Sequence, residues 1–447
     1  MEKQVERFQM LLEDKQFVQI SQEAKEFIAA DMAAILEQMD NEKMLRVFRL
    51  LPKDQAADVF AWLEADDQEY IILSLSEKEA GTIIDNLQSD DATDVLEEMP
   101  SNIVKRLLAH ASPETRNDIN HLLQYEDQSA GSIMTVEFVD LKEDMTVSQA
   151  IDKIRRVGVD SETINTCYVL TKQRILIGTV ALRYLLMEKP DTKIVDFMNT
   201  NVIYTQTDVD QEEVAHIFQK YDFMALPVVD KERRMVGIIT MDDILDIIEE
   251  ETTEDMQRMA AIIPSDTPYL KHGIIDTWKK RIPWLLLLMI SATFTGKIIT
   301  SFEESLSKLV ILTAYIPMLM DTGGNAGNQA STEVVRAISL HEVNFKDFFK
   351  VVWKELRVGI LCGLTLAICN YLKLITIDHI SGQVAFVICV TVLSAVIFSK
   401  LIASILTILV KRSGLDPAVV ASPLLTTSID AITLSIYFTV ATTMLGI

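Results

Sequence analysis

The long apolar runs near the end of the sequence constrain the fold more than any other feature. A helix needs about 20 mostly apolar residues to cross a bilayer. Five segments reach or approach that length: 282–300, 309–320, 358–374, 384–410 and 418–446. The second segment is short, and we include it because the chain has to return between the first and third spans. The sequence therefore predicts an α-helical transmembrane bundle of five spans over residues 282–447.

The charged residues indicate that the rest of the chain is of a different kind. The 447 residues carry a formal net charge of −24. Residues 282–447 hold 11 basic and 10 acidic side chains, whereas the residues before them hold 30 basic and 55 acidic ones. An acidic soluble half thus precedes a nearly uncharged membrane half. Without a net positive field to attract phosphates, the composition argues against a nucleic-acid partner.

Basic residues in the short loops predict the orientation of the spans. They are most frequent before the first span, between the second and third, and after the fourth. Since such residues favour the cytoplasmic side, we expect the soluble half in the cytoplasm and the C-terminus outside. The first segment, MEKQVERFQMLLEDKQ, is charged and helical in pattern, unlike a signal peptide. We therefore predict a multi-pass protein of the lipid bilayer with a cytoplasmic N-terminus.

One acidic residue, Asp430, stands near the middle of the last span. A charge at that depth costs on the order of 3 kcal/mol, so a residue retained there normally faces a polar pathway. In the alternative interpretation, neighbouring threonine hydroxyls satisfy the carboxylate, or it is protonated. We favour a direct role for Asp430 in an ion pathway.

A second unusual segment begins within the short span. Residues 317–331 read PMLMDTGGNAGNQAS, which combines three glycines with two asparagines, a glutamine and an aspartate. Close helix packing explains small residues, but amides beside exposed backbone carbonyls suit a hydrated cation path. We predict that the path is lined by Asp321, Gly324, Asn325, Thr426 and Asp430.

Two other polar residues lie near or within the spans. Asp416 stands before Pro417 at the start of the last span, which is typical of a helix N-cap and also leaves its carboxylate available to an ion. Lys400 lies inside the fourth span. The sequence offers no explanation for Lys400, except that it should not line a cation pore.

The densest charge run in the chain lies between the two halves. The segment MDDILDIIEEETTEDM (241–256) has eight acidic residues and no basic one. Several of them share a helix face, which destabilises a helix unless a hard divalent cation binds them. A merely solvated acidic face is the alternative. Oxygen ligands without a His/Cys cluster suit Mg²⁺, Ca²⁺ or Mn²⁺. We expect a helix over 254–281 to join this segment to the first span.

The cytoplasmic half changes character at about residue 131. Before it, short amphipathic segments with polar or proline starts predict an all-α superhelix of stacked helices. After it come two copies of a strand, helix, paired strands and helix. The second copy, with VVDKERRMVGIITMDDIL, resembles a CBS (cystathionine-β-synthase) module at Gly237, Thr240 and Asp243. The resemblance implies a tandem of α+β CBS domains and an adenine nucleotide such as ATP at Thr240 and Asp243.

The order of these parts resembles the MgtE family of magnesium channels and transporters over essentially the whole chain. The specific motifs are GGNAGNQ (323–329) and DPAVVASPLLTTSID (416–430). The resemblance implies a homodimer in a bacterial cell membrane, with a pore lined by the second and fifth spans in which Asp430 binds hydrated Mg²⁺. It also implies that regulatory Mg²⁺ in the cytoplasm closes the pore. The metal ligands that it implies are Asp58, Asp90, Asp94, Asp210, Glu212, Asp222, Asp243, Asp246, Glu251, Glu254, Asp255, Asp416 and Asp430.

These patterns together predict a multidomain protein that transports Mg²⁺. The expected domains are 1–130 (helical superhelix), 131–198 and 199–252 (CBS domains), 253–281 (acidic connecting helix) and 282–447 (pore). A broader Co²⁺, Ni²⁺ or Mn²⁺ transporter and a coupled carrier stay open. A CBS-regulated anion channel fits less well, because an aspartate lies in a span and no arginine does. We expect no enzyme, since the six histidines are scattered singly and none stands beside a nucleophile motif.

Overall fold

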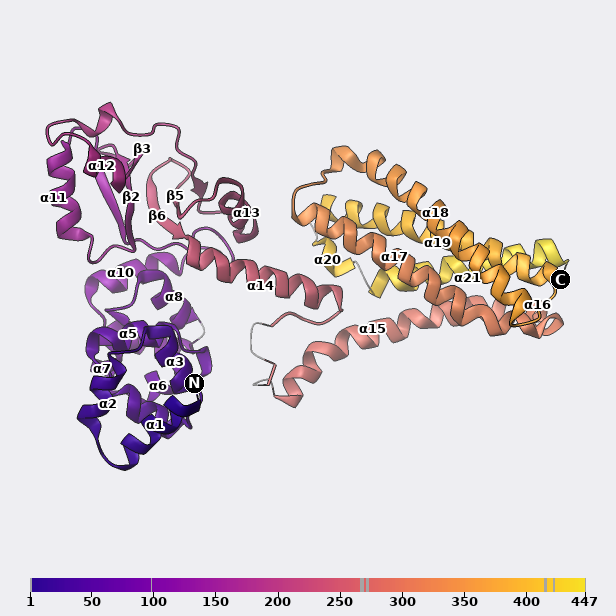
Figure 1. Ribbon diagram of the computed structural model, residues 1–447, viewed down its shortest axis with the longest axis horizontal. Coiled ribbons are helices and arrows are strands. Elements are labelled where there is room, and N and C mark those ends of the chain that lie inside the picture. The colour runs from indigo at the N-terminus through magenta and orange to yellow at the C-terminus, as the bar shows by residue number, and fades with distance from the viewer. Residues whose placement is uncertain are drawn as a thin grey trace. The chain divides into compact units, whose positions relative to one another are not determined.

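The computed structural model describes residues 2–97, 99–265, 269–270, 273–413, 416–420 and 423–446. The chain forms two compact units, Met1–Ile248 and Glu249–Ile447, and we describe each by itself. The helices and strands of both are labelled in Figure 1.

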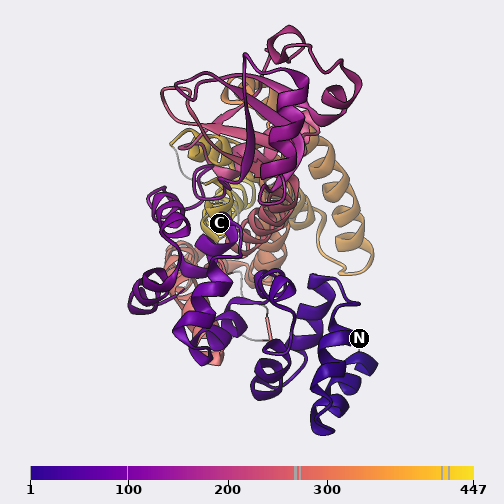
Figure 2. The same cartoon turned by 90° about the vertical axis from the view of Figure 1, so that its left-hand side faces the viewer.

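The first unit begins with a superhelix of short helices. They are α1 (Glu2–Glu13), α2 (Phe17–Ala24), α3 (Ala29–Glu37), α4 (Asn41–Phe48), α5 (Lys53–Ala61), α6 (Ala65–Ser74), α7 (Glu77–Ile84), α8 (Ser89–Glu97), α9 (Ser101–His110) and α10 (Pro113–Leu122). The side chains of Asp40, Ser76 and Ser112 accept hydrogen bonds from backbone N–H groups and so cap α4, α7 and α10. Helices two apart in the chain pack together, such as α3 on α5 and α7 on α9. Figure 2 shows these helices, coloured indigo to purple, apart from the sheets of the same unit. The predicted all-α superhelix is confirmed.

The sheets of the first unit repeat one topology twice. The first copy holds β1 (Phe138–Lys142), α11 (Val147–Val157), β2 (Thr163–Leu170), β3 (Leu176–Ala181) and α12 (Leu182–Met187). The second holds β4 (Thr205–Gln206), α13 (Gln211–Tyr221), β5 (Ala225–Val229) and β6 (Met235–Thr240), followed by α14 (Met241–Met259). In each copy the first strand is parallel to the second, and the second is antiparallel to the third. Apolar side chains of both sheets, including Tyr168 and Ile238, share one core. The tandem of α+β domains is confirmed.

The helix expected over 254–281 is wrong in its extent. α14 ends at Met259, Ala261 has a left-handed backbone with φ +57°, and α15 begins only at Ile274. Pro264 lacks an amide hydrogen and disfavours helical geometry in the residue before it, which favours a break in this region. Ser265 is held from both sides, since its backbone N–H donates to Gln257 and its hydroxyl contacts the Lys280 ammonium.

The second unit is a bundle of helices. They are α15 (Ile274–Ser301), α16 (Glu303–Lys308), α17 (Ile316–Ser339), α18 (Phe348–Thr376), α19 (Gly382–Arg412), α20 (Pro417–Val420) and α21 (Pro423–Leu445). α19 is the central helix, because it packs on α18, α17 and α21. Figure 1 shows these four running side by side.

Four segments of the described chain are long and apolar enough to cross a membrane. They are Ile274–Ser301, Phe345–Thr376, Gly382–Arg412 and Leu425–Leu445, which correspond to the first, third, fourth and fifth predicted spans. The second predicted span, 309–320, is not among these four: Val310–Tyr315 form a 3-10 helix, and α17 runs from Ile316 to Ser339. Hydropathy marked only the apolar beginning of this region. The helices α19 and α21 pack against α17.

Candidate functional site

Glycines of the GGNAGNQ motif bring α17 against its neighbours. A Cβ atom on Gly323 would lie 2.8 Å from Thr433 Oγ1 of α21 and 3.3 Å from Ser399 Oγ of α19. A Cβ atom on Gly327 would lie 2.1 Å from Ile429 Cδ1. The alternative interpretation of the motif, close helix packing, therefore applies to these two glycines.

Alanine at Gly323 is expected to lower the melting temperature of the detergent-purified protein by several degrees. The new methyl group meets the hydroxyl of Thr433, which is buried and stiff, and overpacking of this kind costs about 1–3 kcal/mol. Alanine at Gly324 is the matched control. The nearest atom to its Cβ position is Thr426 Cγ2 at 3.6 Å, so we expect no loss of stability. Equal melting temperatures of the two variants, measured by thermal unfolding with size-exclusion chromatography, would contradict the close approach of α17 to α21.

Other residues of the motif point away from this packing. Asp321, Asn325 and Gln329 recur every fourth residue and are exposed on one face of α17. Asn328 is partly buried, and its Oδ1 atom has no hydrogen-bond partner among the residues that the structure describes. This combination of an exposed polar stripe and an unsatisfied amide oxygen offers oxygen ligands to a hydrated ion.

The predicted residues of the last span lie on α21. Asp430 is half-buried, Thr426 lies one turn before it on the same helix, and Gly324 of α17 faces Thr426. The second unit thus brings Gly324 and Thr426 together, with Asp430 on the same side of α21 as Thr426. Asp321 and Asn325 occupy the exposed face of α17.

A group of carboxylates meets where α8 approaches the second CBS sheet. Asp90 is only 9% exposed, and burial together with the charges of Asp243 and Asp91 raises its pKa well above the usual value. Burial and the charge of Asp243 raise the pKa of Asp91 to about 6. The same two causes raise the pKa of Glu162 to about 7. Burial also raises the pKa of Asp243, although its Oδ2 atom accepts a 2.6 Å hydrogen bond from the Thr240 hydroxyl. These carboxylates would be stabilised by a cation placed among them.

Among the described residues, these carboxylates do not form a metal coordination sphere. Within the described part of the chain, no three acidic, histidine or cysteine side chains are arranged to hold a metal ion. Asp90 and Asp243 were predicted as ligands and are close in space, and the charge of Asp58 contributes to the raised pKa of Asp91. Asp91 and Glu162 were not predicted. Glu162 precedes β2, and no local sequence pattern places it opposite α8.

The stability of the first unit is expected to fall as the pH rises from about 4 to about 7 in the absence of divalent ions. An acid whose pKa is raised in the folded state binds a proton that the unfolded state has already lost, so folding becomes weaker as that proton leaves. For Asp91, a pKa of about 6 corresponds to about 2–3 kcal/mol lost by pH 7.

Urea unfolding of residues 1–248 in a chelator checks this pH dependence. Asp91→Asn should reduce this fall by its own share, whereas Asp66→Asn, at an exposed position elsewhere in the superhelix, should not. A wild-type profile without this fall would contradict the assignment.

Two further predicted ligands lie at opposite ends of α13. Asp210 caps its beginning, where Oδ1 accepts a 2.9 Å hydrogen bond from the backbone N–H of Glu212. Asp222 ends the helix with a left-handed backbone, φ +52°. Within one chain these two carboxylates therefore serve local structure and do not share a site.

The end of α14 carries an ion-pair cluster with Asp416. The Arg258 guanidinium pairs with Glu254 one turn earlier and donates to Asp416 Oδ2. The other oxygen of Asp416 accepts a 2.7 Å hydrogen bond from Ala418 N, so the predicted N-cap role is confirmed. Arg258, the one basic residue of α14, thus occupies the space between two predicted metal ligands. Sequence reasoning missed it, since it stands beyond the acidic run.

The first unit has a cavity of about 600 Å³ between the two CBS copies. Its lining includes aromatic and amide side chains, namely Tyr168, Tyr184, Phe197, Asn199, Asn201 and Tyr221. Thr240 and Asp243 do not line it. They bond to each other and face the carboxylates of α8, whose negative field disfavours a phosphate. The nucleotide role of Thr240 and Asp243 therefore stays a prediction, and the large cavity is a second candidate for a nucleotide site.

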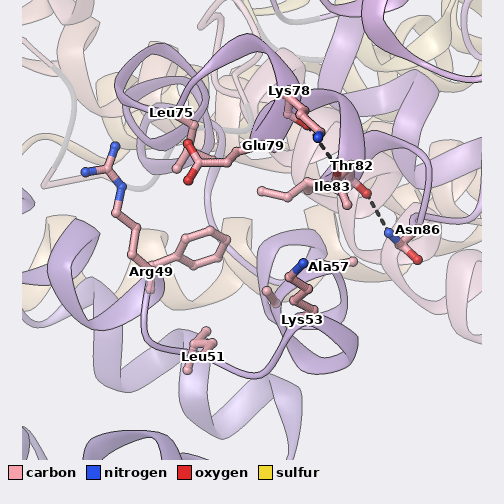
Figure 3. A pocket seen from close by; sticks show the side chains of 12 residues that line it. Arg49, Leu51, Lys53, Ala57, Leu75, Lys78, Glu79, Thr82, Ile83 and Asn86 are labelled. Atoms are coloured by element: carbon pink, nitrogen blue, oxygen red, sulfur yellow. Dashed lines mark hydrogen bonds between the residues drawn. The ribbon is translucent and has the colours of Figure 1, made fainter. Parts of the chain in front are cut away.

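A smaller pocket of about 240 Å³ lies among α4, α5 and α7 (Figure 3). Three cations, Arg49, Lys53 and Lys78, and one carboxylate, Glu79, line it together with polar groups and apolar ones such as Leu51 and Ile83. None of the predicted site residues lies there, and its positive lining excludes it as a cation site.

These features define a class of protein: a membrane cation transporter with a cytosolic CBS region. The comparisons with known proteins agree. Residues 28–128 match the MgtE intracellular N domain, 194–250 match the CBS domain, and 316–440 match the model described as MgtE, a divalent cation transporter.

Curated relatives extend the match to nearly the whole chain. The magnesium transporter MgtE of Thermus thermophilus is 36% identical over 418 residues, which cover 93% of this chain and 92% of the relative. The magnesium transporter MgtE of Bacillus subtilis is 31% identical over 414 residues, 92% of this chain and 91% of the relative. This chain therefore belongs to the MgtE family.

Two solved structures resemble the cytosolic part. The soluble part of a magnesium transporter shares 30% identity with a TM-score of 0.53, covering 56% of this chain and 99% of that one. The cytosolic domain of the Mg²⁺ channel MgtE in complex with ATP shares 35% identity with a TM-score of 0.52, covering 54% of this chain and 99% of that one.

Proposed function

We propose that this chain carries Mg²⁺ across a bacterial cell membrane. The observation that carries the proposal is the polar surface of α17, with Asp321, Asn325 and Gln329 exposed on one face, together with Asp430 on α21. A polar stripe on a helix of a membrane bundle has to be covered by protein or water rather than by lipid. Family membership, through relatives named as magnesium transporters, supports Mg²⁺ as the ion.

A second copy of the chain is the partner that would complete the pore. In a homodimer, two α17 stripes and two Asp430 carboxylates would face one another across the axis and surround a hydrated ion. A hydrated Mg²⁺ fits such a lining, because Mg²⁺ releases its water reluctantly and is held through it by carboxylates and amides. We infer that the second α17 helix replaces lipid on this face.

Regulation is proposed to come from the cytoplasmic carboxylates. Burial first, and then the charges of neighbouring carboxylates, raise the pKa values of Asp90, Asp91, Glu162 and Asp243 when no cation is present. Cytoplasmic Mg²⁺ would remove that repulsion and favour a compact arrangement in which the pore is shut. In this proposal the N-terminus lies in the cytoplasm and the C-terminus lies outside.

Uptake into proteoliposomes tests the transport proposal directly. The full-length protein should take up Mg²⁺ faster than empty vesicles do. Competition with Mn²⁺, Co²⁺ and Ni²⁺ separates a Mg²⁺-selective path from a broader one. Imposed proton and Na⁺ gradients separate a channel from a coupled carrier, since only the carrier's flux follows them. Vesicles that take up none of these ions under any internal Mg²⁺ concentration would overturn the proposal.

We also propose that the 600 Å³ CBS cavity binds ATP. The aromatic lining suits an adenine ring, and the related cytosolic domain is described in complex with ATP. Tyr184→Ala is expected to weaken ATP binding about tenfold through loss of stacking. Leu186→Ala is the control, because Leu186 is exposed on the same helix but does not line the cavity. Calorimetry showing equal affinities for both variants would contradict this placement.

A further inference from the structure

The interface of α18 and α19 contains two buried charges that the proposed pore does not use. Glu355 of α18 is 7% exposed and Lys400 of α19 is 5% exposed. Lys400 Nζ lies 3.8 Å from Glu355 Oε2. Both helices belong to the segments that are long and apolar enough to cross a membrane. Either charge alone would be uncompensated in that setting, so each accounts for the presence of the other.

Two glycines continue the same face of α18. Gly359 and Gly363 follow Glu355 at intervals of four residues, which is the Gly-xxx-Gly spacing of closely packed membrane helices. A Cβ atom on Gly359 would lie 3.2 Å from Ile397 Cα, and one on Gly363 would lie 3.3 Å from Leu393 Cα. Three successive turns of α18 therefore contact α19, and the ion pair forms one end of this contact.

The other side of α19 meets the motif helix α17. Ser399 stands next to Lys400, and its Oγ atom is 3.3 Å from the Cβ position of Gly323. Eight residues further on, the hydroxyl of Thr407 lies 3.0 Å from that of Ser331 on α17. Successive residues of a helix differ by about 100° in direction, so a rotation of α19 by one position would turn the Lys400 ammonium toward α17.

We propose that Glu355 and Lys400 are positioning residues for cation transport, because their ion pair locks the rotation of α19. The lock keeps Ser399 against Gly323 and keeps a positive charge away from the helix that carries the pore motif. Neither residue touches the transported ion. The proposal rests on the proposed function for its transport readout, and a second readout, described below, is independent of transport.

The first experiment compares Mg²⁺ uptake by full-length variants in proteoliposomes. Lys400→Met and Glu355→Gln should each slow uptake about tenfold or more, because each leaves the other charge buried and unpaired. The double variant should recover to within about threefold of wild type, since the two neutral side chains no longer conflict. Lys354→Met, at the exposed position beside Glu355, should have no effect.

The second experiment measures the rotation of α19 itself. Ser331→Cys and Thr407→Cys are introduced into a background in which Cys167, Cys362, Cys369 and Cys389 are replaced by serine. Oxidative cross-linking of this pair should be fast in the parent, slower in each single charge variant, and fast again in the double variant. Samples are compared only after all elute as a single species in size-exclusion chromatography.

Several outcomes would overturn the proposal. Single variants that transport and cross-link like the parent would show that the pair locks nothing. A double variant that cross-links normally but stays inactive would show that one of the charges acts on the ion directly. If the wild type itself carries no Mg²⁺, the proposed function fails, while the cross-linking result still decides whether the pair holds α19.

Discussion

Replacing Asp430 with alanine is expected to reduce Mg²⁺ uptake at least about tenfold, down toward the level of empty vesicles. A divalent ion held through its water shell about 5 Å from a carboxylate gains about 2 kcal/mol at the dielectric constant of water and more in a less polar site. Each 1.4 kcal/mol corresponds to a factor of ten. Asp430 is half-buried on α21, one turn from Thr426, so water surrounds its carboxylate less fully than a carboxylate at the surface.

Two further substitutions separate charge from shape at this position. Asp430→Asn keeps the size of the side chain and should be nearly as inactive as the alanine variant. Asp430→Glu keeps the charge and should retain part of the uptake. If the alanine and asparagine variants both transport at the wild-type rate, Asp430 has a structural role and the ion path lies along Asn325.

Neutralising the cytoplasmic carboxylates is expected to remove most of the inhibition by internal Mg²⁺. In Asp90→Asn/Asp91→Asn/Asp243→Asn, the amides neither repel one another without the ion nor bind it with charge. An effector shifts a two-state equilibrium only through its differential affinity, and a coupled site typically contributes about 5- to 150-fold. The internal Mg²⁺ concentration that halves uptake should therefore rise at least about fivefold.

Deletion of residues 1–248 extends this test to the whole first unit. The remaining residues form a compact unit of their own, and their uptake should no longer respond to internal Mg²⁺. Asp66→Asn should keep the wild-type response, because this exposed residue lies away from the carboxylate group. Persistent inhibition of the shortened chain would place the sensor within residues 249–447 instead.

Local sequence patterns predicted a large part of the fold. Capping residues such as Ser76 and Ser112 mark helix starts, because the first backbone N–H groups of a helix need acceptors that these side chains supply nearby in the chain. The two CBS copies were visible because each repeats the same succession of strands and helix. Asp430 stood out since a charge is rare inside an apolar run.

Contacts between residues that are far apart in the sequence could not be predicted from local patterns. The carboxylate group joins α8, the start of β2 and the start of α14, and neither periodicity nor spacing reports that Glu162 meets Asp91 and Asp243. The same holds for Arg258 with Asp416, and for Lys400 with Glu355. The bounds of α17 escaped the sequence for another reason: hydropathy treats lipid as the surroundings, whereas much of α17 is covered by α19 and α21.

The break between α14 and α15 determines how force can pass between them. A single helix from 241 to 301 would act as a rigid shaft, and twisting one end would twist the other. α14 instead ends at Met259, and Ala261 has a left-handed backbone, so α14 does not continue as one helix into α15. Side-chain contacts hold the end of α14 instead. Met259 packs with Val335 and Ala418, and Arg258 forms an ion pair with Asp416. The last turn of α14 is therefore joined to α17 and α20 by side-chain contacts.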